Sequence, residues 1–233
     1  MNEFTPFPKI SRLFRRIIVT EKLDGTNGQV FIWDENADVL VKGTHVLAEG
    51  THDQSVKAGP PPEGIPFLAT IGSVNIAAGS RNRWLTIEKD NFNFARWVRE
   101  NASELAQLGH GRHFGEWWGL GIQRGYGITE KRFSLFNTIR WCPHGQEPKK
   151  IETQDPRIEK YQDVLPACCH LVPVLYEGMM STLEINDQLI CLEENGSEAA
   201  PGFMNPEGII IYHTASNQCF KYTLDGDGHK RTR

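Results

Sequence analysis

A lysine next to an acidic residue, just before an Asp-Gly pair, is the stretch of this sequence best suited to covalent chemistry. Residues 21–28 read EKLDGTNG and place Lys22 beside Glu21 and before Asp24-Gly25. A lysine amine attacks an electrophile only when it is neutral, and its ordinary pKa is about 10.4. Cationic or metal neighbours, or burial, would have to activate Lys22. Because Asp-Gly is also typical of a plain turn, the local residues leave both interpretations open.

Runs of β-forming residues lie on both sides of this turn and would fix the direction of Lys22. Residues 17–22 (IIVTEK) and 28–33 (GQVFIW) favour strands. The Asp-Glu-Asn stretch that follows predicts a turn into a third strand over 38–42. Gly25 would allow a positive φ within the turn.

Strands are predicted more often than helices along the rest of the chain. Asp90 can cap a helix that ends near Gly109, and Ser181 with Glu184 forms a capping box for a second helix. Further strands are predicted in the stretches 113–119, 132–141, 208–212 and 219–224. We therefore expect an α+β fold with mostly antiparallel sheets. We expect a single domain over residues 1–233, with a Gly- and Pro-rich surface insertion at 43–79.

Composition and charge limit the class of protein. The chain is 39% hydrophobic and 23% charged, and it has no apolar run near the length of about 18 residues that a membrane span needs. Five cysteines and an N-terminus unlike a signal peptide favour the cytoplasm or another intracellular reducing compartment. The net charge of −4 argues against a uniformly basic nucleic-acid binder. Residues 108–150, however, hold seven Lys/Arg against three Asp/Glu, whereas 177–208 hold seven acids and no Lys/Arg. A polyanion would be drawn to the first region.

Five further segments follow EKLDGTNG in a recognisable order. They are AGSRNRWL (78–85), HFGEWWG (113–119), KRFSLFN (131–137), PEGIIIY (206–212) and CFKYTL (219–224). Their order and spacing resemble the six-segment signature of the covalent lysyl-nucleotidyltransferases, which include ATP-dependent RNA ligases, DNA ligases and mRNA capping enzymes. The form Glu-Lys-x-Asp-Gly-Thr-Asn is most similar to the RNA ligase branch typified by the second phage T4 RNA ligase. A lone Lys-x-Asp-Gly is a weak signal, but six segments in family order are a strong one.

The resemblance implies a fold and an activity. The fold would be the nucleotidyltransferase (adenylation) domain of the ATP-grasp-like DNA and RNA ligases, with mostly antiparallel sheets and flanking helices. Lys22 would attack the α-phosphate of ATP, release pyrophosphate and hold AMP through a P–N bond, with Mg²⁺ or Mn²⁺ as the cofactor. AMP would then pass to an RNA 5′-phosphate, and that end would be sealed to a 3′-OH. RNA ends or nicks are therefore the expected partners, and a membrane is not.

The resemblance also assigns roles to single residues. Glu21 would meet the adenine edge, Asn27 would order the metal and phosphate, and Glu116 would accept hydrogen bonds from the ribose hydroxyls. Arg81 would grip ribose or phosphate with its fork of donors. Phe133 would stack on the purine.

Three further expectations concern the remaining matched segments. Phe136 lies three residues after Phe133, points to the other face of its strand and is expected in the core. Glu207 would bind the metal ion. The further candidates for contact with the RNA backbone are Arg83, Lys131 and Arg132.

Lys221 would grip the α-phosphate and help to activate Lys22, since like charges disfavour protonation. The sequence departs from the family pattern here. The family usually has Lys-x-Lys, whereas this chain reads Lys221-Tyr222-Thr223. A residue such as Lys230 could replace the second lysine.

The short stretch after Lys221 leads us to expect a lone nucleotidyltransferase domain without a C-terminal OB-fold or helical module. The insertion 43–79 and the basic stretch 108–150 could grip RNA in its place. Two alternatives stay open. One is a nick-sealing DNA ligase. The other is a nucleotide- or RNA-binding module, or a repair-complex subunit, that lacks complete ligation activity.

Overall fold

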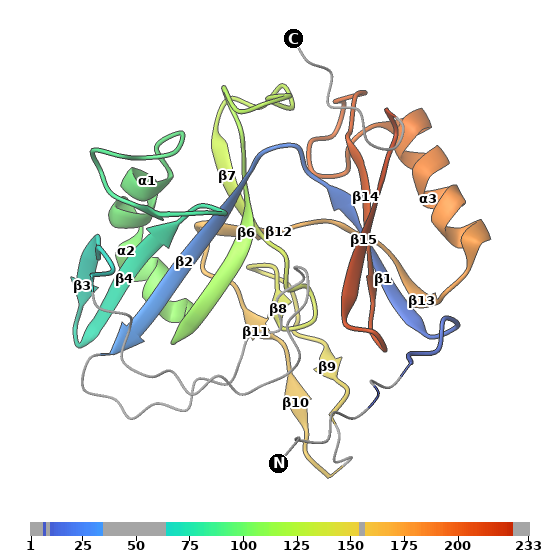
Figure 1. Cartoon of the computed structure of the whole chain (residues 1–233), viewed down its shortest axis with the longest axis horizontal. Coiled ribbons are helices and arrows are strands. Elements are labelled where there is room, and N and C mark those ends of the chain that lie inside the picture. Colours follow the sequence, from blue (N-terminus) through green and yellow to red (C-terminus); the bar gives the residue numbers. More distant parts are fainter. Residues whose placement is uncertain (1–6, 8–9, 35–63, 154–156, 226–233) are drawn as a thin grey trace, which may run out of the picture.

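Two antiparallel sheets dominate the computed structural model, which describes residues 7, 10–34, 64–153 and 157–225. The smaller sheet has four strands in the order β13-β1-β14-β15 (Figure 1). Its strands are β1 (Arg16–Lys22), β13 (Val174–Met179), β14 (Gly208–His213) and β15 (Gln218–Thr223). Every pair in it is antiparallel.

The larger sheet has seven strands in the order β12-β7-β6-β2-β4-β3, with β5 paired to β4. The strands are β2 (Thr26–Asp34), β3 (Ala69–Ile71), β4 (Val74–Gly79), β5 (Trp84–Leu85), β6 (Gly111–Gly119), β7 (Lys131–Leu135) and β12 (Cys169–Leu171). Only the β12–β7 pair of this sheet is parallel. The antiparallel character predicted from the sequence is thus confirmed.

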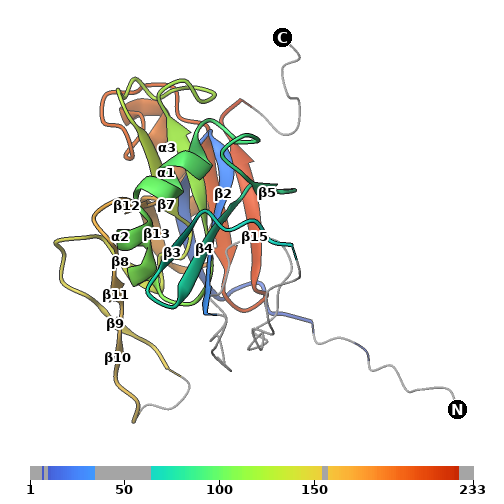
Figure 2. The same cartoon turned by 90° about the vertical axis from the view of Figure 1, so that its left-hand side faces the viewer.

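Two short strand pairs lie outside the two main sheets (Figures 1 and 2). β8 (Trp141–Cys142) pairs in parallel with β11 (Asp163–Val164), and β9 (Lys150–Ile151) pairs antiparallel with β10 (Lys160–Tyr161). The strand predicted over 132–141 is therefore divided between β7 and β8, because the chain turns after Phe136.

The helices flank the sheets, as predicted. α1 (Phe94–Glu100), α2 (Ala102–Leu105) and the 3₁₀ helix η1 (Ala106–Leu108) pack on the large sheet, and α3 (Thr182–Asn195) covers the outer face of the small one (Figure 1). Among the described residues, no helix has both the length and the apolar character needed to cross a membrane.

The caps of these helices follow the sequence in part. The Ser181 hydroxyl accepts the Glu184 amide hydrogen at 3.4 Å and caps α3 as predicted. Asp90 Oδ1 accepts the Ala95 amide hydrogen at 2.7 Å, which supports the start of α1. The predicted first helix is interrupted at Asn101, whose side-chain nitrogen donates to the Trp97 carbonyl at 2.8 Å.

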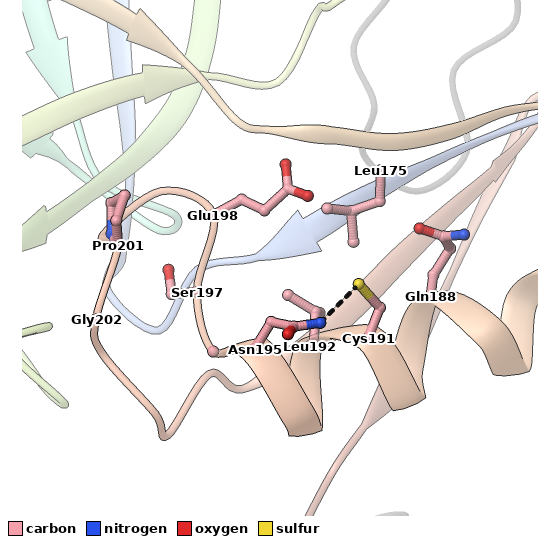
Figure 3. Close-up of a pocket in the computed structure, with 10 residues that line it drawn as sticks. Leu175, Gln188, Cys191, Leu192, Asn195, Ser197, Glu198, Pro201 and Gly202 are labelled. Atoms are coloured by element: carbon pink, nitrogen blue, oxygen red, sulfur yellow. Dashed lines mark hydrogen bonds between the residues drawn. The ribbon is translucent and has the colours of Figure 1, made fainter.

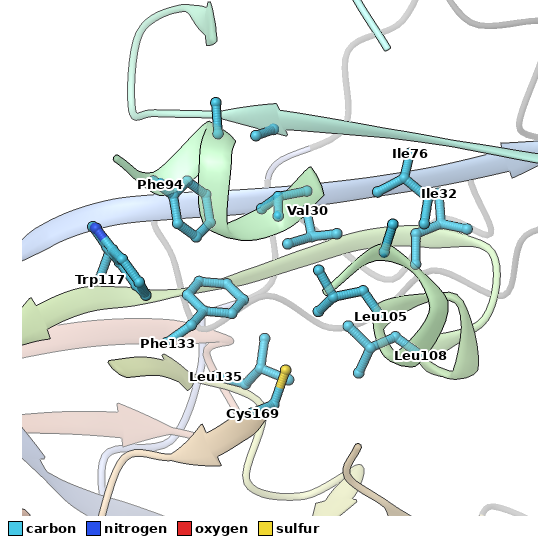
Figure 4. Packing of buried hydrophobic residues seen from close by; sticks show 14 of the residues in the cluster. Val30, Ile32, Ile76, Phe94, Leu105, Leu108, Trp117, Phe133, Leu135 and Cys169 are labelled. Atoms are coloured by element: carbon cyan, nitrogen blue, oxygen red, sulfur yellow. The ribbon is translucent and has the colours of Figure 1, made fainter. Parts of the chain in front are cut away.

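The main core lies between the large sheet and helices α1 and α2. Alternate residues of each strand point into it because successive side chains of a strand face opposite ways. Val30 of β2, Trp117 of β6 and Phe133 of β7 meet Phe94 of α1 there (Figure 4). The residues between them on each strand therefore face the opposite side of the sheet.

The predicted surface insertion at 43–79 is wrong where the structure describes it. Residues 69–79 form β3 and β4, and β4 lies beside β2 with Ile76, Ala77 and Ala78 fully buried. A strand buried on both faces loses the alternating pattern that marks a strand in sequence. The predicted strand 38–42 and the part of the insertion before residue 64 lie outside the described residues.

Candidate active site

Lys22 lies where the chain passes from the small sheet to the large one. It is the last residue of β1, and Thr26 is the first residue of β2, so only Leu23–Gly25 separate the two strands (Figure 1). The predicted placement of Lys22 at the end of a strand is confirmed. This position brings its side chain within reach of groups from both sheets.

Glu207 is the direct partner of Lys22. Lys22 Nζ donates to Glu207 Oε2 at 2.5 Å, and the two side chains are 23% and 18% exposed. The β1–β14 ladder causes this contact, because Lys22 pairs with Gly208 and Glu207 is the preceding residue. A charge-assisted hydrogen bond in a half-buried place is among the stronger polar contacts in proteins.

Glu116 approaches the same turn from the large sheet. Its carboxylate accepts the Gly25 amide hydrogen at 3.2 Å and a hydrogen of the Asn27 side chain at 3.3 Å. The side chain is buried, and burial is the largest of the effects that together raise the pKa of Glu116 to about 8. The Lys22 charge lowers this pKa, whereas the Glu207 charge raises it. The ribose contact of Glu116 remains a prediction.

Gly25 is required by space rather than by backbone conformation. A Cβ atom at this position would lie 2.5 Å from the Trp117 carbonyl oxygen and 2.8 Å from Trp118 Cβ. The positive φ expected from the sequence is not found at Gly25. The turn that carries Lys22 thus packs directly on the backbone of β6, and any larger residue would push it away.

Asn27 connects Glu116 to Arg81. Its side-chain oxygen accepts a hydrogen bond from Arg81 Nε at 2.9 Å, while its nitrogen donates to Glu116. Arg81 is exposed. Its guanidinium therefore lies at the rim of the site, within reach of an anionic ligand.

Lys221 shares a face of the small sheet with Lys22. It pairs with Ile210 of β14, and Ile210 pairs with Thr20 of β1, two residues before Lys22. Residues paired across an antiparallel ladder point to the same side, so the exposed Lys221 amine lies on the side of Lys22. Lys230, the predicted substitute for a second lysine, lies outside the described residues.

Glu21 points to the opposite face from Lys22. Its Oε2 accepts the amide hydrogens of Glu198 and Ala199, both at 2.9 Å. The side chain is 1% exposed, its Oε1 has no hydrogen-bond partner, and burial raises its pKa. Contact with the adenine edge remains a prediction for that unpaired oxygen.

The prediction that Phe133 stacks on a purine is wrong. Phe133 is fully buried, with its ring 5.1 Å from that of Phe94 and 5.7 Å from that of Trp97 (Figure 4). The β6–β7 register explains the error, because Glu116 pairs with Ser134. Odd-numbered residues of β7 face the helices, on the other side of the sheet from Glu116.

Phe136, which the sequence analysis predicted on the other face of the strand from Phe133 and in the core, lies on the Glu116 face. Its amide hydrogen bonds to the Phe114 carbonyl at 3.0 Å and continues the ladder, so its side chain lies on the Glu116 face. It is partly buried in the cluster that contains Leu23 and Trp118. The spacing from Glu116 could have revealed it only if the β6–β7 register had been known.

Comparison with known proteins agrees with this geometry. A model of the RNA ligase family matches residues 15–223. The chain belongs to the RNA ligase family. The resemblance inferred from the six segments is thereby confirmed. No curated protein sequence matches the chain.

Several solved structures of a Naegleria gruberi RNA ligase resemble this family member. A mutant without ligand matches at 15% identity and TM-score 0.48, over 91% of this chain and 50% of that one. A mutant with ATP and Mn matches at 14% identity and TM-score 0.47, over 91% of this chain and 50% of that one. A mutant with AMP and Mn matches at 15% identity and TM-score 0.47, over 91% of this chain and 51% of that one. This RNA ligase family chain thus spans about half the length of the solved structures it matches.

The basic residues expected to contact RNA in this RNA ligase family chain mostly contact other groups of the protein. Of the three RNA candidates, Arg83 donates to the carbonyls of Lys89 and Asp90, Lys131 to that of Phe92, and Arg132 pairs with Glu130. Within 108–150, six of the seven Lys/Arg contact a ring, carbonyl or carboxylate of the protein: Arg112, Arg124, Lys131, Arg132, Arg140 and Lys150. RNA contact by this stretch remains a prediction.

The residues around Lys22 suit a metal ion that takes some of its ligands from the protein and the others from a bound substrate. Among the described residues, no group of three or more His, Cys, Asp or Glu is placed to hold a metal. Mg²⁺ commonly takes one or two carboxylates and completes its shell with water and substrate phosphates. Glu207 is half-buried beside Lys22 and fits that role.

A hollow of about 330 Å³ lies elsewhere, between α3 and the loop that follows it (Figure 3). Leu175, Cys191 and Ser197 are among the residues that line it, and Glu198 is the charged one. A carboxylate in an otherwise neutral lining would repel a triphosphate. Leu175 also packs with α3 on the face away from Lys22, so this hollow does not serve the Lys22 site.

Proposed function

We propose that the chain is an ATP-dependent RNA ligase that works through a Lys22–AMP intermediate. The Lys22 amine attacks the α-phosphate of ATP, a P–N bond forms, and pyrophosphate leaves. AMP is then transferred to an RNA 5′-phosphate, and a 3′-OH displaces AMP to close the phosphodiester bond. The observation that carries the proposal is the meeting of Lys22, Glu207 and Glu116 at the junction of the two sheets.

The proposed first step requires Lys22 to leave Glu207 and lose its proton. Glu207 Oε2 is the nearest base, 2.5 Å from the amine. A divalent ion held by Glu207 would neutralise the negative charge that develops on the phosphate oxygens. Lys221, on the same face of the small sheet, would bind the α-phosphate, and Arg81 would bind ribose or phosphate from the rim.

Phe136 would stack on the base, and Glu21 would distinguish adenine from guanine. Phe136 offers a ring on the Glu116 face, and stacking of a base on an aromatic ring contributes about 1–3 kcal/mol. The unpaired Oε1 of Glu21 would accept a hydrogen from the amino group of adenine. Guanine would present a carbonyl oxygen there instead, which the carboxylate repels. These arguments favour ATP over GTP.

Labelled nucleotide tests the proposal directly. The protein is incubated with α-³²P-ATP, Mg²⁺ or Mn²⁺ and 5′-phosphorylated RNA. We expect labelled protein, a mass increase of one AMP and sealed RNA. Lys22→Ala should abolish all three, whereas Lys160→Ala, a change at an exposed lysine of β10, should leave them intact. Wild-type protein with neither adduct nor product would refute the proposal.

The nucleic-acid substrate and the compartment are part of the same proposal. The family match supports RNA as the substrate. Comparing the sealing of nicked DNA with the sealing of RNA-containing nicks in the same assay distinguishes an RNA ligase from a DNA ligase. An adduct without sealing would point to a partial enzyme that acts within a larger assembly. We place the protein in an intracellular reducing compartment, which is supported by five cysteines that are all free thiols.

A further inference from the structure

Arg124 joins three segments that are far apart in the sequence. It lies in the connection between β6 and β7, and its side chain is 17% exposed. Its Nε donates to Asp24 Oδ2 at 3.0 Å, and its Nη2 donates to Asp225 Oδ2 at 2.5 Å. Its Nη1 donates to the Asn205 carbonyl at 3.1 Å and to the Asn205 side-chain oxygen at 2.9 Å. One guanidinium thus contacts both sides of the junction.

These three segments are the ones that carry the reactive groups. Asp24 lies two residues after Lys22, and Asn205 lies two residues before Glu207. Asp225 follows the end of β15, the strand that carries Lys221. Arg124 therefore contacts the end of β1, the approach to β14 and the end of β15 at the same time.

The loop around Arg124 is held in an unfavourable backbone conformation. Gln123 and Tyr126 have φ values of 46° and 52°, although neither is glycine. Such conformations persist only where the surrounding structure holds them, and they are common at functional sites. The buried Tyr126 hydroxyl accepts the Asp24 amide hydrogen at 2.8 Å, so the loop contacts the turn after Lys22 at two points.

We propose that Arg124 is a positioning residue for the adenylation of Lys22. It acts through Asp24 and Asn205, and it fixes the distance between Lys22 and Glu207. The planar fork of arginine can bind all three segments together, whereas a lysine presents a single ammonium on a flexible stem. The inference rests on the proposed function and adds a residue that none of the six segments contains.

The test compares Arg124→Lys with a matched change far from Lys22. Arg140→Lys is the control, because Arg140 donates in a similar way to Asp163 at 2.9 Å and to the Leu108 carbonyl at 3.0 Å. The single-turnover rate of Lys22 adenylation is measured against ATP concentration. We expect Arg124→Lys to slow the rate at saturating ATP at least tenfold and to change the half-saturating ATP concentration less than threefold. Arg140→Lys should leave both within threefold, with a similar loss of melting temperature.

A double-mutant cycle tests the route through Asp24. Asp24→Asn should also slow adenylation. The double variant Arg124→Lys/Asp24→Asn should be no slower than the slower single variant, because both substitutions remove the same contact between Arg124 and Asp24.

The outcomes separate this inference from the proposed function. Wild-type protein that forms no adduct refutes the function and the inference with it. If the wild type forms the adduct and Arg124→Lys is adenylated at a rate within threefold of the wild-type rate, the inference is overturned and the proposed function is not. A loss expressed only in ATP affinity, or an equal loss in Arg140→Lys, overturns it as well.

Discussion

Replacing Glu116 with glutamine should destabilise the folded protein at acidic pH and stabilise it at alkaline pH. Glu116 is 9% exposed, and burial is the largest cause that raises its pKa from 4.5 to about 8. The folded protein therefore holds this proton more tightly than the unfolded chain does. The resulting stabilisation is fully present below about pH 4.5 and is lost as the pH rises through about 8.

The magnitude follows from the two pKa values. The difference between about 8 and 4.5, at about 1.36 kcal/mol per pH unit, corresponds to about 5 kcal/mol of stability lost by the wild type at high pH. Glutamine does not ionise and avoids this loss. It has one acceptor oxygen for the two donors, Gly25 and Asn27, and losing one hydrogen bond costs about 1 kcal/mol. Glu116→Gln should thus be about 1 kcal/mol less stable at pH 4, about as stable as the wild type near pH 5, and about 3–4 kcal/mol more stable at pH 9.

Urea unfolding of both proteins from pH 4 to pH 9 measures this crossover. Glu147→Gln, at an exposed position, is the control and should track the wild type throughout. Lys22→Ala should enlarge the stability advantage of Glu116→Gln at pH 9, because the Lys22 charge lowers the pKa of Glu116 in the folded protein. A difference between Glu116→Gln and wild type that stays the same at every pH would refute the reasoning.

Three further substitutions test the geometry of the site and of the core behind it. Gly25→Ala should destabilise the fold by about 1–3 kcal/mol and slow Lys22 adenylation, because the new Cβ meets the β6 backbone at 2.5 Å. Gly79→Ala, whose Cβ would meet its nearest neighbour at 3.4 Å, should do neither in the same unfolding and adenylation assays. Phe133→Ala should cost about 3–5 kcal/mol of stability in denaturant titrations, because it opens a cavity in the core. Phe136→Ala should weaken ATP binding measured by calorimetry, and unchanged ATP affinity would remove Phe136 from the proposed base site.

The sequence predicted the elements around Lys22 well because the signals are local. β-forming residues on both sides of the turn predict β1 and β2, and the strand ends confirm the placement of Lys22. Ser181 caps α3 as its sequence indicates, since a cap depends on residues only three apart. The order of the six segments was sufficient to identify the family.

The errors arise where the outcome depends on distant partners. The choice between Phe133 and Phe136 depends on how β7 pairs with β6, and a shift of one residue exchanges the two faces. The strand β4 was missed because it is buried on both faces and rich in small residues. Arg124 has no local signal at all, because its partners lie 81 to 101 residues away in the chain.

The chain crosses between the two sheets at two places among the described residues, and these crossings lie side by side. One is Leu23–Gly25, and the other is residues 172–173, between β12 and β13. Leu23 and Val172 pack in one cluster, and the Glu21 amide hydrogen bonds to the Pro173 carbonyl at 3.0 Å. Two adjacent crossings define a hinge axis between the two sheets.

When one body rotates on another, each point moves in proportion to its distance from the axis. Lys22 directly precedes the first crossing, so it is near this axis and would move least. Strands β3 and β15, at edges of the two sheets, lie farther from this axis and would move more. A rotation of one sheet against the other about these crossings would therefore change the spacing of the outer strands while Lys22 keeps its place.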